Sequence, residues 1–174
     1  MDKNNDYYRP SDDTFLLAEC VKNFSGEGAL EIAAGTGYIS NLLKEKFRSV
    51  VATDIDPDAL REAGKSVLLV CCDSASAIVN VAFDLIVINP PYLPSQGMHD
   101  LAVDGGKDGV EVTLKMLNDA IRLLKCNGTI MLVTSSLANY NTLFAYMQKL
   151  GYKTDIVGKK KFAFEELLVI QCKR

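Results

Sequence analysis

The residues best suited to chemistry are Asn89, Pro90, Pro91 and Tyr92, which directly follow the apolar run 83–88. Two consecutive prolines end a strand and restrict the backbone, so the asparagine before them is held at a fixed angle. The side-chain oxygen of Asn89 and the carbonyl of Pro90 can accept both N–H groups of a planar NH2, and Tyr92 can form an aromatic wall beside it. Asn-Pro also starts ordinary turns, but its place at a strand end favours a catalytic role.

An amide or aromatic NH2 is a weak nucleophile because its lone pair is delocalised into the neighbouring π system. Two oxygen acceptors would orient this nitrogen toward an electrophilic methyl group, and holding the reacting atoms ~3–3.5 Å apart is most of what the displacement requires. No strong general base is needed before transfer, since the alkylated nitrogen loses its proton easily. The four residues therefore predict methylation of a planar NH2 nitrogen.

A second group of residues predicts an adenosine-containing ligand. The segment from Glu31 to Gly37 is rich in small residues and precedes a predicted helix, so its backbone can approach a ligand and the helix can present free N–H groups. Such a turn alone often serves only tight packing. Asp54, about 20 residues further on, can accept both hydroxyls of a ribose. Asp73 can accept an adenine amino group, although an aspartate at a strand end is as readily a cap.

The details of this segment favour S-adenosylmethionine over a dinucleotide. A dinucleotide site carries G-x-G-x-x-G around a pyrophosphate, whereas Ala33 takes the place of the first glycine here. We expect Glu31 to lie inside the turn, where it would repel a pyrophosphate but suit the cationic amino acid end of S-adenosylmethionine.

Strands alternate with helices along most of the chain. The sequence predicts strands over 29–33, 49–53, 67–71, 83–88 and 129–134, and helices over 38–47, 57–64, 109–125 and 139–150. Two last strands, 152–157 and 162–172, are joined by Gly158, Lys159, Lys160 and Lys161 and form a predicted hairpin. This order predicts a single α/β domain over 1–174 with a Rossmann-like, doubly wound, mostly parallel sheet and a C-terminal antiparallel hairpin. Ligands of such sheets bind at the carboxyl ends of the strands.

Composition argues against several classes of protein. The net charge is −3, with 48% apolar and 24% charged residues, so the basic excess of a typical DNA-binding protein is missing. The only basic cluster, 159–161, should lie at the rim of the site or simply in a solvated turn. The five cysteines form no C-x-x-C pair and His99 is the only histidine, which predicts no metal site and no disulfide framework.

The location of the protein is predicted from the apolar runs and from the first residues. Residues 1–6 are polar and acidic, unlike a signal peptide. Every apolar run is far shorter than the ~20 residues that span a bilayer. We expect a soluble protein of the cytoplasm, with the nucleus as the alternative.

With these residues in place, the chain resembles the class I methyltransferases, and more narrowly the HemK-like release-factor glutamine methyltransferases in their short eukaryotic and archaeal form. The segment 8–17, Y-R-P-S-D-D-T-F-L-L, is similar to the family's opening Y-x-P-x-x-D-[ST]-x-L-L segment. Residues 89–92 match its N-P-P-Y motif, and 104–109 is similar to the glycine-rich loop that follows, although such a segment can also be a flexible surface loop. The replacement of the usual first glycine by Ala33 should be tolerated, with weaker cofactor binding as its cost.

The resemblance implies roles for individual residues. It implies that the catalytic residues are Asn89, Pro90, Pro91 and Tyr92. It also implies that the residues in contact with S-adenosylmethionine are Thr14, Glu31, Ala33, Gly35, Gly37, Asp54, Asp73, Ser74 and Asn89. The product of the cofactor is S-adenosylhomocysteine. The implied substrate is the glutamine of the Gly-Gly-Gln loop in a class 1 translation release factor, alone or in complex with its GTPase.

A partner subunit is expected on two grounds. The resemblance implies a small zinc-binding activator that forms a heterodimer with the catalytic chain. In the strand order expected for this fold, three-two-one-four-five-seven-six, the strand from Val67 to Cys71 lies at an edge and carries no charge, proline or bulge signal to protect it. We therefore predict that another chain adds a strand there. The alternative is that the N-terminal segment of the chain itself covers this edge.

Other activities compatible with parts of the pattern stay open at this point. Asn-Pro-Pro-Tyr also suits adenine or cytosine amino-methyltransferases, which flip a base out of DNA or RNA, although the chain has no spare length for a target-recognition domain. A protein lysine methyltransferase could admit an amine to the same pocket. A nicotinamide oxidoreductase would not explain 89–92, and Thr14, Asp54 and Asn89 argue against a catalytically inactive binding module.

Overall fold

The computed structural model describes residues 8–64, 67–95, 100 and 102–174. The interpretations of residues 1–6 and of His99 lie outside this part of the chain, and so do the first seven residues of the N-terminal segment that was the alternative cover for the sheet edge. Seven strands form one sheet in the order β3-β2-β1-β4-β5-β7-β6, the predicted order. The strands are β1 (Gly26–Ile32), β2 (Phe47–Asp54), β3 (Leu68–Cys71), β4 (Phe83–Ile88), β5 (Leu124–Ser135), β6 (Lys153–Lys161) and β7 (Glu166–Lys173).

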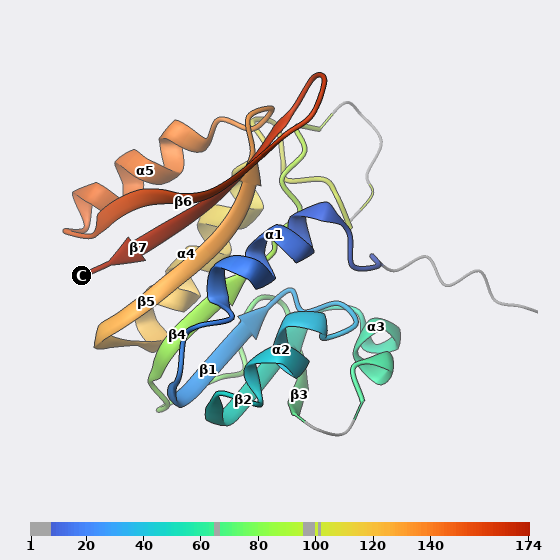
Figure 1. The fold of residues 1–174 in the computed structure, drawn as a ribbon, viewed down its shortest axis with the longest axis vertical. Coiled ribbons are helices and arrows are strands. Elements are labelled where there is room, and N and C mark those ends of the chain that lie inside the picture. Colours follow the sequence, from blue (N-terminus) through green and yellow to red (C-terminus); the bar gives the residue numbers. More distant parts are fainter. Residues whose placement is uncertain (1–7, 65–66, 96–99, 101) are drawn as a thin grey trace, which may run out of the picture.

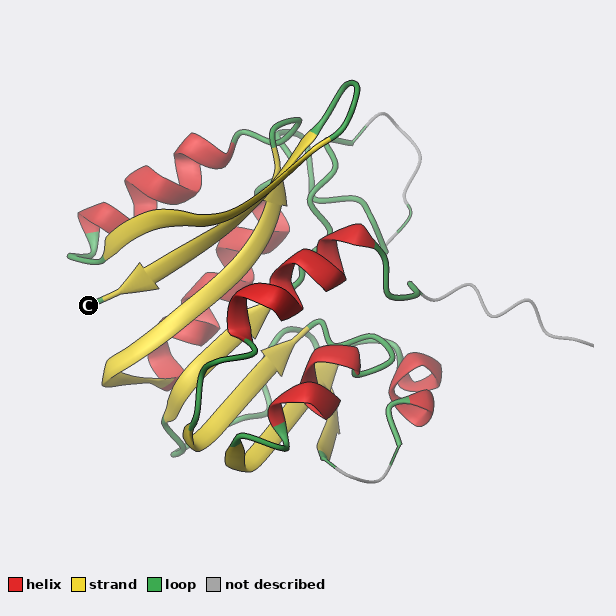
Figure 2. Cartoon of the chain, in the orientation of Figure 1, coloured by secondary structure: helices red, strands yellow, loops and turns green. Residues whose placement is uncertain are grey.

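The first five strands are parallel and the last two form an antiparallel hairpin. Strand β1 pairs in parallel with β2 and β4, and β3 and β5 extend the parallel sheet on either side. Strand β7 is antiparallel to β5 and to β6. Figures 1 and 2 show the strands fanning across the molecule, with β3 and β6 at its two edges. The carboxyl ends of β1, β2 and β4 therefore meet at one side of the sheet, where a ligand site is expected.

Helices cover both faces of the sheet and bury its apolar side chains. On one face lie α1 (Asp12–Val21) and α2 (Tyr38–Leu43), and on the other α4 (Glu111–Leu123) and α5 (Tyr140–Lys149). The short α3 (Pro57–Glu62) packs against β2 and β3 and begins with an Asp56 side chain that accepts from the N–H groups of Asp58 and Ala59. No helix of the described residues is both long and apolar enough to cross a membrane.

Several details of the predicted elements were wrong. Strand β5 begins at Leu124, inside the predicted helix 109–125 and five residues before the predicted strand. Helix α1 was not predicted at all. Helix α2 ends at Leu43 rather than at residue 47, because Phe47 is already buried as the first residue of β2. The turn of the hairpin lies at 162–165 rather than at 158–161, since β6 continues to Lys161 past a register shift between Ile156 and Gly158. The cluster 159–161 thus lies in a strand, although at the predicted end of the sheet.

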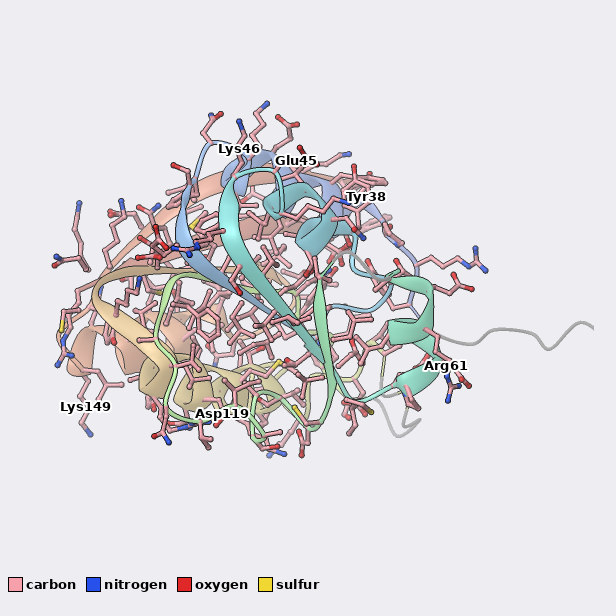
Figure 3. All side chains as sticks on the ribbon, turned by 90° about the horizontal axis from the view of Figure 1, so that it is seen from below. Tyr38, Glu45, Lys46, Arg61, Asp119 and Lys149 are labelled. Carbon is pink, nitrogen blue, oxygen red and sulfur yellow. The ribbon has the colours of Figure 1, made fainter. Side chains whose placement is uncertain are left out.

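The two edges of the sheet differ in character. Strand β3 presents Leu68, whose side chain is 62% exposed, and the exposed Leu69. Strands β2 and β3 lie at the bottom of Figure 1 and so face the viewer in Figure 3, where the labelled Lys46 and Arg61 project from neighbouring elements into solvent. The opposite edge, β6, carries four lysines and a register shift. Lysines and irregularities protect β6 from pairing with other chains, whereas β3 has no such protection.

Candidate active site

A cavity of about 690 Å³ opens at the carboxyl ends of β1, β2 and β4 and beside the start of α1. All but one of the residues predicted for the site line it: Thr14, Glu31, Ala33, Gly35, Asp54, Asp73, Ser74, Asn89, Pro90, Pro91 and Tyr92. Gly37 does not line the cavity. It precedes α2 with a φ of 71°, and a Cβ there would lie 2.7 Å from that of Ala63, so this glycine serves the turn and the packing of the chain.

The loop after β1 is tied to the end of β2 through Asp54. The N–H of Gly35 donates to Oδ2 of Asp54 over 2.7 Å, and the N–H of Asp56 donates to Oδ1 over 2.9 Å. Ala33 and Gly35 both have positive φ, 59° and 52°, which is costly for the alanine. These bonds fix the direction of the carboxylate, and each of its oxygens keeps a lone pair for a further donor.

Glu31 lies in β1 rather than in the turn, contrary to the prediction. Its side chain is 2% exposed, and its Oε2 accepts from the N–H of Ser40 over 2.7 Å and from the Ser40 hydroxyl. Burial raises the pKa of Glu31 to about 7. The two hydrogen bonds from Ser40 lower this pKa, and the negative charge of Asp54 raises it. The group is therefore a buried carboxyl whose ionised form would be stabilised by a cation in the cavity.

At the end of β3 the carboxylate of Asp73 forms an ion pair with Lys115 of α4, and both side chains are about half exposed. Ser74 beside it is buried and has a φ of 55°. Asp73 thus keeps free lone pairs at the wall of the cavity while Lys115 fixes its position.

A partly buried hydrogen-bond chain sets the orientation of Asn89. The Thr14 hydroxyl lies 3.2 Å from Oδ1 of Asp13 and 3.1 Å from Nδ2 of Asn89. A carboxylate only accepts, so Thr14 must donate to Asp13 and accept from the Asn89 amide. This assigns the nitrogen of Asn89 to Thr14 and leaves its oxygen as an acceptor beside the cavity.

Asp13 also holds Tyr92. The Tyr92 hydroxyl donates to Oδ2 of Asp13 over 2.9 Å, and the Tyr8 hydroxyl donates to Oδ1. Burial first, and then the neighbouring Asp13 carboxylate, raise the pKa of both phenols well above its usual range. The two tyrosines therefore remain protonated donors, and the ring of Tyr92 is anchored as a wall of the cavity.

The glycine-rich segment 104–109 packs against the Asn-Pro-Pro-Tyr turn and is not a loose surface loop. The N–H of Gly105 donates to the carbonyl of Leu93 over 2.8 Å. A Cβ on Gly105 would lie 2.8 Å from the carbonyl oxygen of Pro91, and one on Gly109 only 2.4 Å from that of Tyr92. Glycine is needed here because the two backbones touch.

Sequence reasoning missed Asp13 and Tyr8 as members of the site. A signal was present, because Asp13 shares one face of α1 with the fully buried Leu17 and Val21, at a spacing of four residues. A carboxylate on the buried face of a helix needs several donors. Such a residue is therefore a candidate for a role in the site.

Comparisons with known proteins agree with this geometry. The sequence model of the methyltransferase small domain matches residues 10–164. A Methanocaldococcus jannaschii protein, named provisionally as a protein N5-glutamine methyltransferase, is 32% identical over 96% of this chain and 91% of its own length. The Mus musculus methyltransferase HEMK2 is 29% identical over 95% and 89%. One solved structure, that of the E. cuniculi Mtq2–Trm112 complex, is described as responsible for methylation of the eRF1 translation termination factor. A chain of this complex superposes on the present chain with a TM-score of 0.84 and 27% identity, over 97% of this chain and 99% of that one.

Proposed function

The chain belongs to the methyltransferase small domain family and is a class I, S-adenosylmethionine-dependent methyltransferase, and from this premise we propose that it methylates the side-chain amide nitrogen of a glutamine. The substrate we propose is the Gly-Gly-Gln loop of a class 1 translation release factor, and S-adenosylhomocysteine is the second product. The names of the relatives support this assignment, because they include a protein glutamine methyltransferase and a complex that acts on a termination factor. The same proposal places the protein in the cytoplasm, where such factors act.

The cofactor half of the cavity fits an adenosine linked to a cationic amino acid. Asp54, whose direction is fixed by the N–H groups of Gly35 and Asp56, would accept the ribose hydroxyls. Asp73 would accept the adenine amino group, and Glu31 would face the positive end of the ligand. When bound, S-adenosylmethionine supplies an electrophilic methyl group.

The acceptor half fits a planar NH2. Oδ1 of Asn89 and the carbonyl oxygen of Pro90 would accept its two hydrogens and fix the plane of the amide. Tyr92 would pack beside this plane, because its hydroxyl is held by Asp13. The single observation that carries the proposal is the bond from Asn89 to Thr14, since it leaves the asparagine an oxygen acceptor rather than an N–H donor at the strand tip. An amine that enters as an ammonium would match this pair of acceptors less well.

Transfer of label from S-adenosylmethionine tests the proposal. The purified chain with its partner subunit should label a release factor, and a release factor with Gln→Ala in the Gly-Gly-Gln loop should stay unlabelled. Duplex DNA and a lysine-rich protein serve as parallel acceptors. Label on DNA or on lysine, with none on the release factor, would contradict the proposed substrate and favour one of the alternatives.

The partner that we propose is a small zinc-binding activator subunit that adds a strand to β3. Support comes from the exposed Leu68 and Leu69 at an edge that has no charged residue to protect it. The E. cuniculi structure is likewise a complex of two different proteins. A strand added there would cover apolar surface that is otherwise exposed to water.

Two matched substitutions test this interface. Leu68→Lys should abolish co-purification with the partner, since a charge would enter the covered edge. Val157→Lys, at an exposed position of the opposite edge strand β6, should leave the complex intact. Loss of the complex in both variants, or in neither, would contradict pairing at β3.

A further inference from the structure

The turn of the C-terminal hairpin carries two phenylalanines that the rest of the chain leaves in solvent. Residues 159–164, K-K-K-F-A-F, are all exposed, and Phe164 is 94% exposed. The N–H of Phe162 donates to the carbonyl of Glu165 over 2.7 Å and closes the turn, so its backbone does not depend on either ring. A lone exposed apolar residue is ordinary, but two phenylalanines in one short turn form a patch. We call Phe162 and Phe164 the aromatic tip.

The aromatic tip lies at the active-site end of the sheet. Leu167 of β7 is opposite Ser135, the last residue of β5, and Lys161 of β6 is opposite Glu166. The turn between β6 and β7 therefore projects beyond the carboxyl ends of the parallel strands (Figure 1). Strand β4, which precedes Asn89, is separated from β7 and β6 by β5. Neighbouring strands are ~4.8 Å apart, so the hairpin lies roughly 10–15 Å from the strand end that carries Asn89.

Specific contacts fix the hairpin relative to the active site. Nζ of Lys160 lies 2.8 Å from Asp12 at the start of α1, the helix whose next residues orient Asn89. On the other side, the N–H of Ser136 donates to the carbonyl of Glu166, and the N–H of Glu166 donates to the Ser136 hydroxyl, both over 2.9 Å. The hairpin is thus bonded both to α1 and to the loop after β5, which sets the position of the aromatic tip.

The charges around the aromatic tip favour a protein over a nucleic acid as its ligand. Lysines beside aromatic rings suit a single-stranded nucleic acid where positive charge is in excess. Here the three lysines 159–161 lie among four carboxylates. Asp12 and Glu166 pair with two of the lysines, and Asp13 and Glu165 line the space beside the hairpin. The surface therefore offers apolar area without a net positive charge.

We propose that the aromatic tip is a docking surface for the protein substrate, on which an apolar patch beside the methyl-accepting loop is seated. The proposal rests on the proposed function. An extended chain rises about 3.3 Å per residue, so the tip reaches residues about three to five positions away from the glutamine held at Asn89. These residues lie outside Gly-Gly-Gln. Leu137, 50% exposed in the loop bonded to the hairpin, adds to the apolar area. The tip therefore recognises the factor around the loop, whereas Asn89 recognises the amide.

The test uses the complex of the chain with its partner, and steady-state methylation of a release factor. Phe164→Ser should raise KM for the factor about tenfold, because the contact loses a phenyl ring, and should leave kcat unchanged. The KM for a short peptide centred on Gly-Gly-Gln and the dissociation constant of the cofactor should keep their wild-type values. Phe164→Leu retains an apolar side chain and should restore most of the affinity. Leu150→Ser is the control, because Leu150 is 41% exposed and precedes β6 at the opposite end of the sheet.

Each result decides between named alternatives. If Phe164→Ser and Phe162→Ser both give the wild-type KM for the factor, the tip is no docking surface. A KM that rises equally for the peptide would mean that the tip acts on the loop itself, which also contradicts the proposal. If Phe164→Ser instead abolishes binding of a single-stranded RNA or dimerisation of the complex, with an unchanged KM for the factor, the tip binds nucleic acid or a second copy and the proposal is wrong. A wild-type complex that never methylates the factor contradicts the proposed function as well, whereas an unchanged KM contradicts the docking surface alone.

Discussion

Two buried carboxyl groups, those of Asp13 and Glu31, line the cavity, and they differ in how many hydrogen-bond donors the chain supplies to them. Asp13, 4% exposed, accepts from the hydroxyls of Tyr8, Tyr92 and Thr14 and from the N–H of Thr14. Among the described residues, only Ser40 donates to Glu31, which is 2% exposed, and both bonds reach the same oxygen. The pKa of Glu31 is raised to about 7 mainly by burial.

The difference indicates what each half of the cavity is built to do. The acceptor half is organised by the protein alone, since four donors from the chain stabilise Asp13 and through it orient Thr14, Asn89 and Tyr92. The cofactor half leaves Glu31 short of positive charge, which a bound cationic ligand would supply. Preorganised acceptors lose no reorganisation energy during the reaction, whereas an under-compensated carboxyl favours binding of a cation.

The strongest test of this contrast is Asn89→Ala. Loss of the oriented acceptor should lower kcat about a thousandfold, equivalent to about 4 kcal/mol, while the dissociation constant of the cofactor changes only a few fold. Isothermal titration and single-turnover methylation measure the two quantities separately. Asn118→Ala, on the exposed face of α4, is the control. Turnover that survives Asn89→Ala would refute the role given to this residue.

Glu31 should make the protein without cofactor less stable as the pH rises. The pKa of Glu31 in the folded protein, about 7, lies above its ordinary value of 4.5. The stability that the protonated carboxyl contributes is therefore fully present below pH ~4.5 and is lost as the pH rises to about 7. The shift corresponds to about 3 kcal/mol. Glu31→Gln should therefore raise the free energy of unfolding at pH 8 relative to wild type, and have little effect at pH 4.5. The free energy of unfolding of both proteins is measured by chemical denaturation across this pH range. If it depends on pH equally in both, the charge of Glu31 does not destabilise the folded protein.

The contrast between the halves also explains which parts of the site could be read from the sequence. The strand tips were predictable, because glycines, prolines and aspartates after apolar runs identify the ends of strands. The sheet order followed from the alternation of strands and helices with a final hairpin. Asp13 and Glu31 were harder, because their roles depend on which donors the fold brings to them. Tyr92 reaches Asp13 only after α1 packs against β5, β6 and β7. The turn at 162–165 depends on a register shift that no local pattern marks.

Asp13→Asn should lower the rate of methylation without abolishing it, because Asp13 positions the residues of the acceptor half. An asparagine cannot accept from all four donors, so the orientation of Asn89 becomes less defined. We expect kcat to fall about thirtyfold, equivalent to about 2 kcal/mol for a charged hydrogen bond, with cofactor affinity near that of wild type. Thr14→Val should act in the same direction, and Glu19→Gln, on the exposed side of α1, should be neutral.

A double variant separates positioning from a general loss of structure. If Asp13 acts through Asn89, then Asp13→Asn combined with Asn89→Ala should be hardly slower than Asn89→Ala alone. Additive losses in kcat would instead mean that Asp13 contributes to the reaction independently of Asn89.

The smallest expected effect concerns Ala33, in the cofactor half, where the chain carries an alanine at a φ of 59°. A left-handed conformation costs an L-residue roughly 1–2 kcal/mol, and glycine avoids this cost. Ala33→Gly should therefore stabilise the protein by about 1 kcal/mol, seen as a higher midpoint of urea denaturation, with the cofactor bound equally or more tightly. Ala34→Gly is a matched control, because Ala34 is buried and has no positive φ, so glycine there should destabilise the protein. A loss of stability in both variants would mean that the methyl group of Ala33 contributes more through packing than its backbone conformation costs.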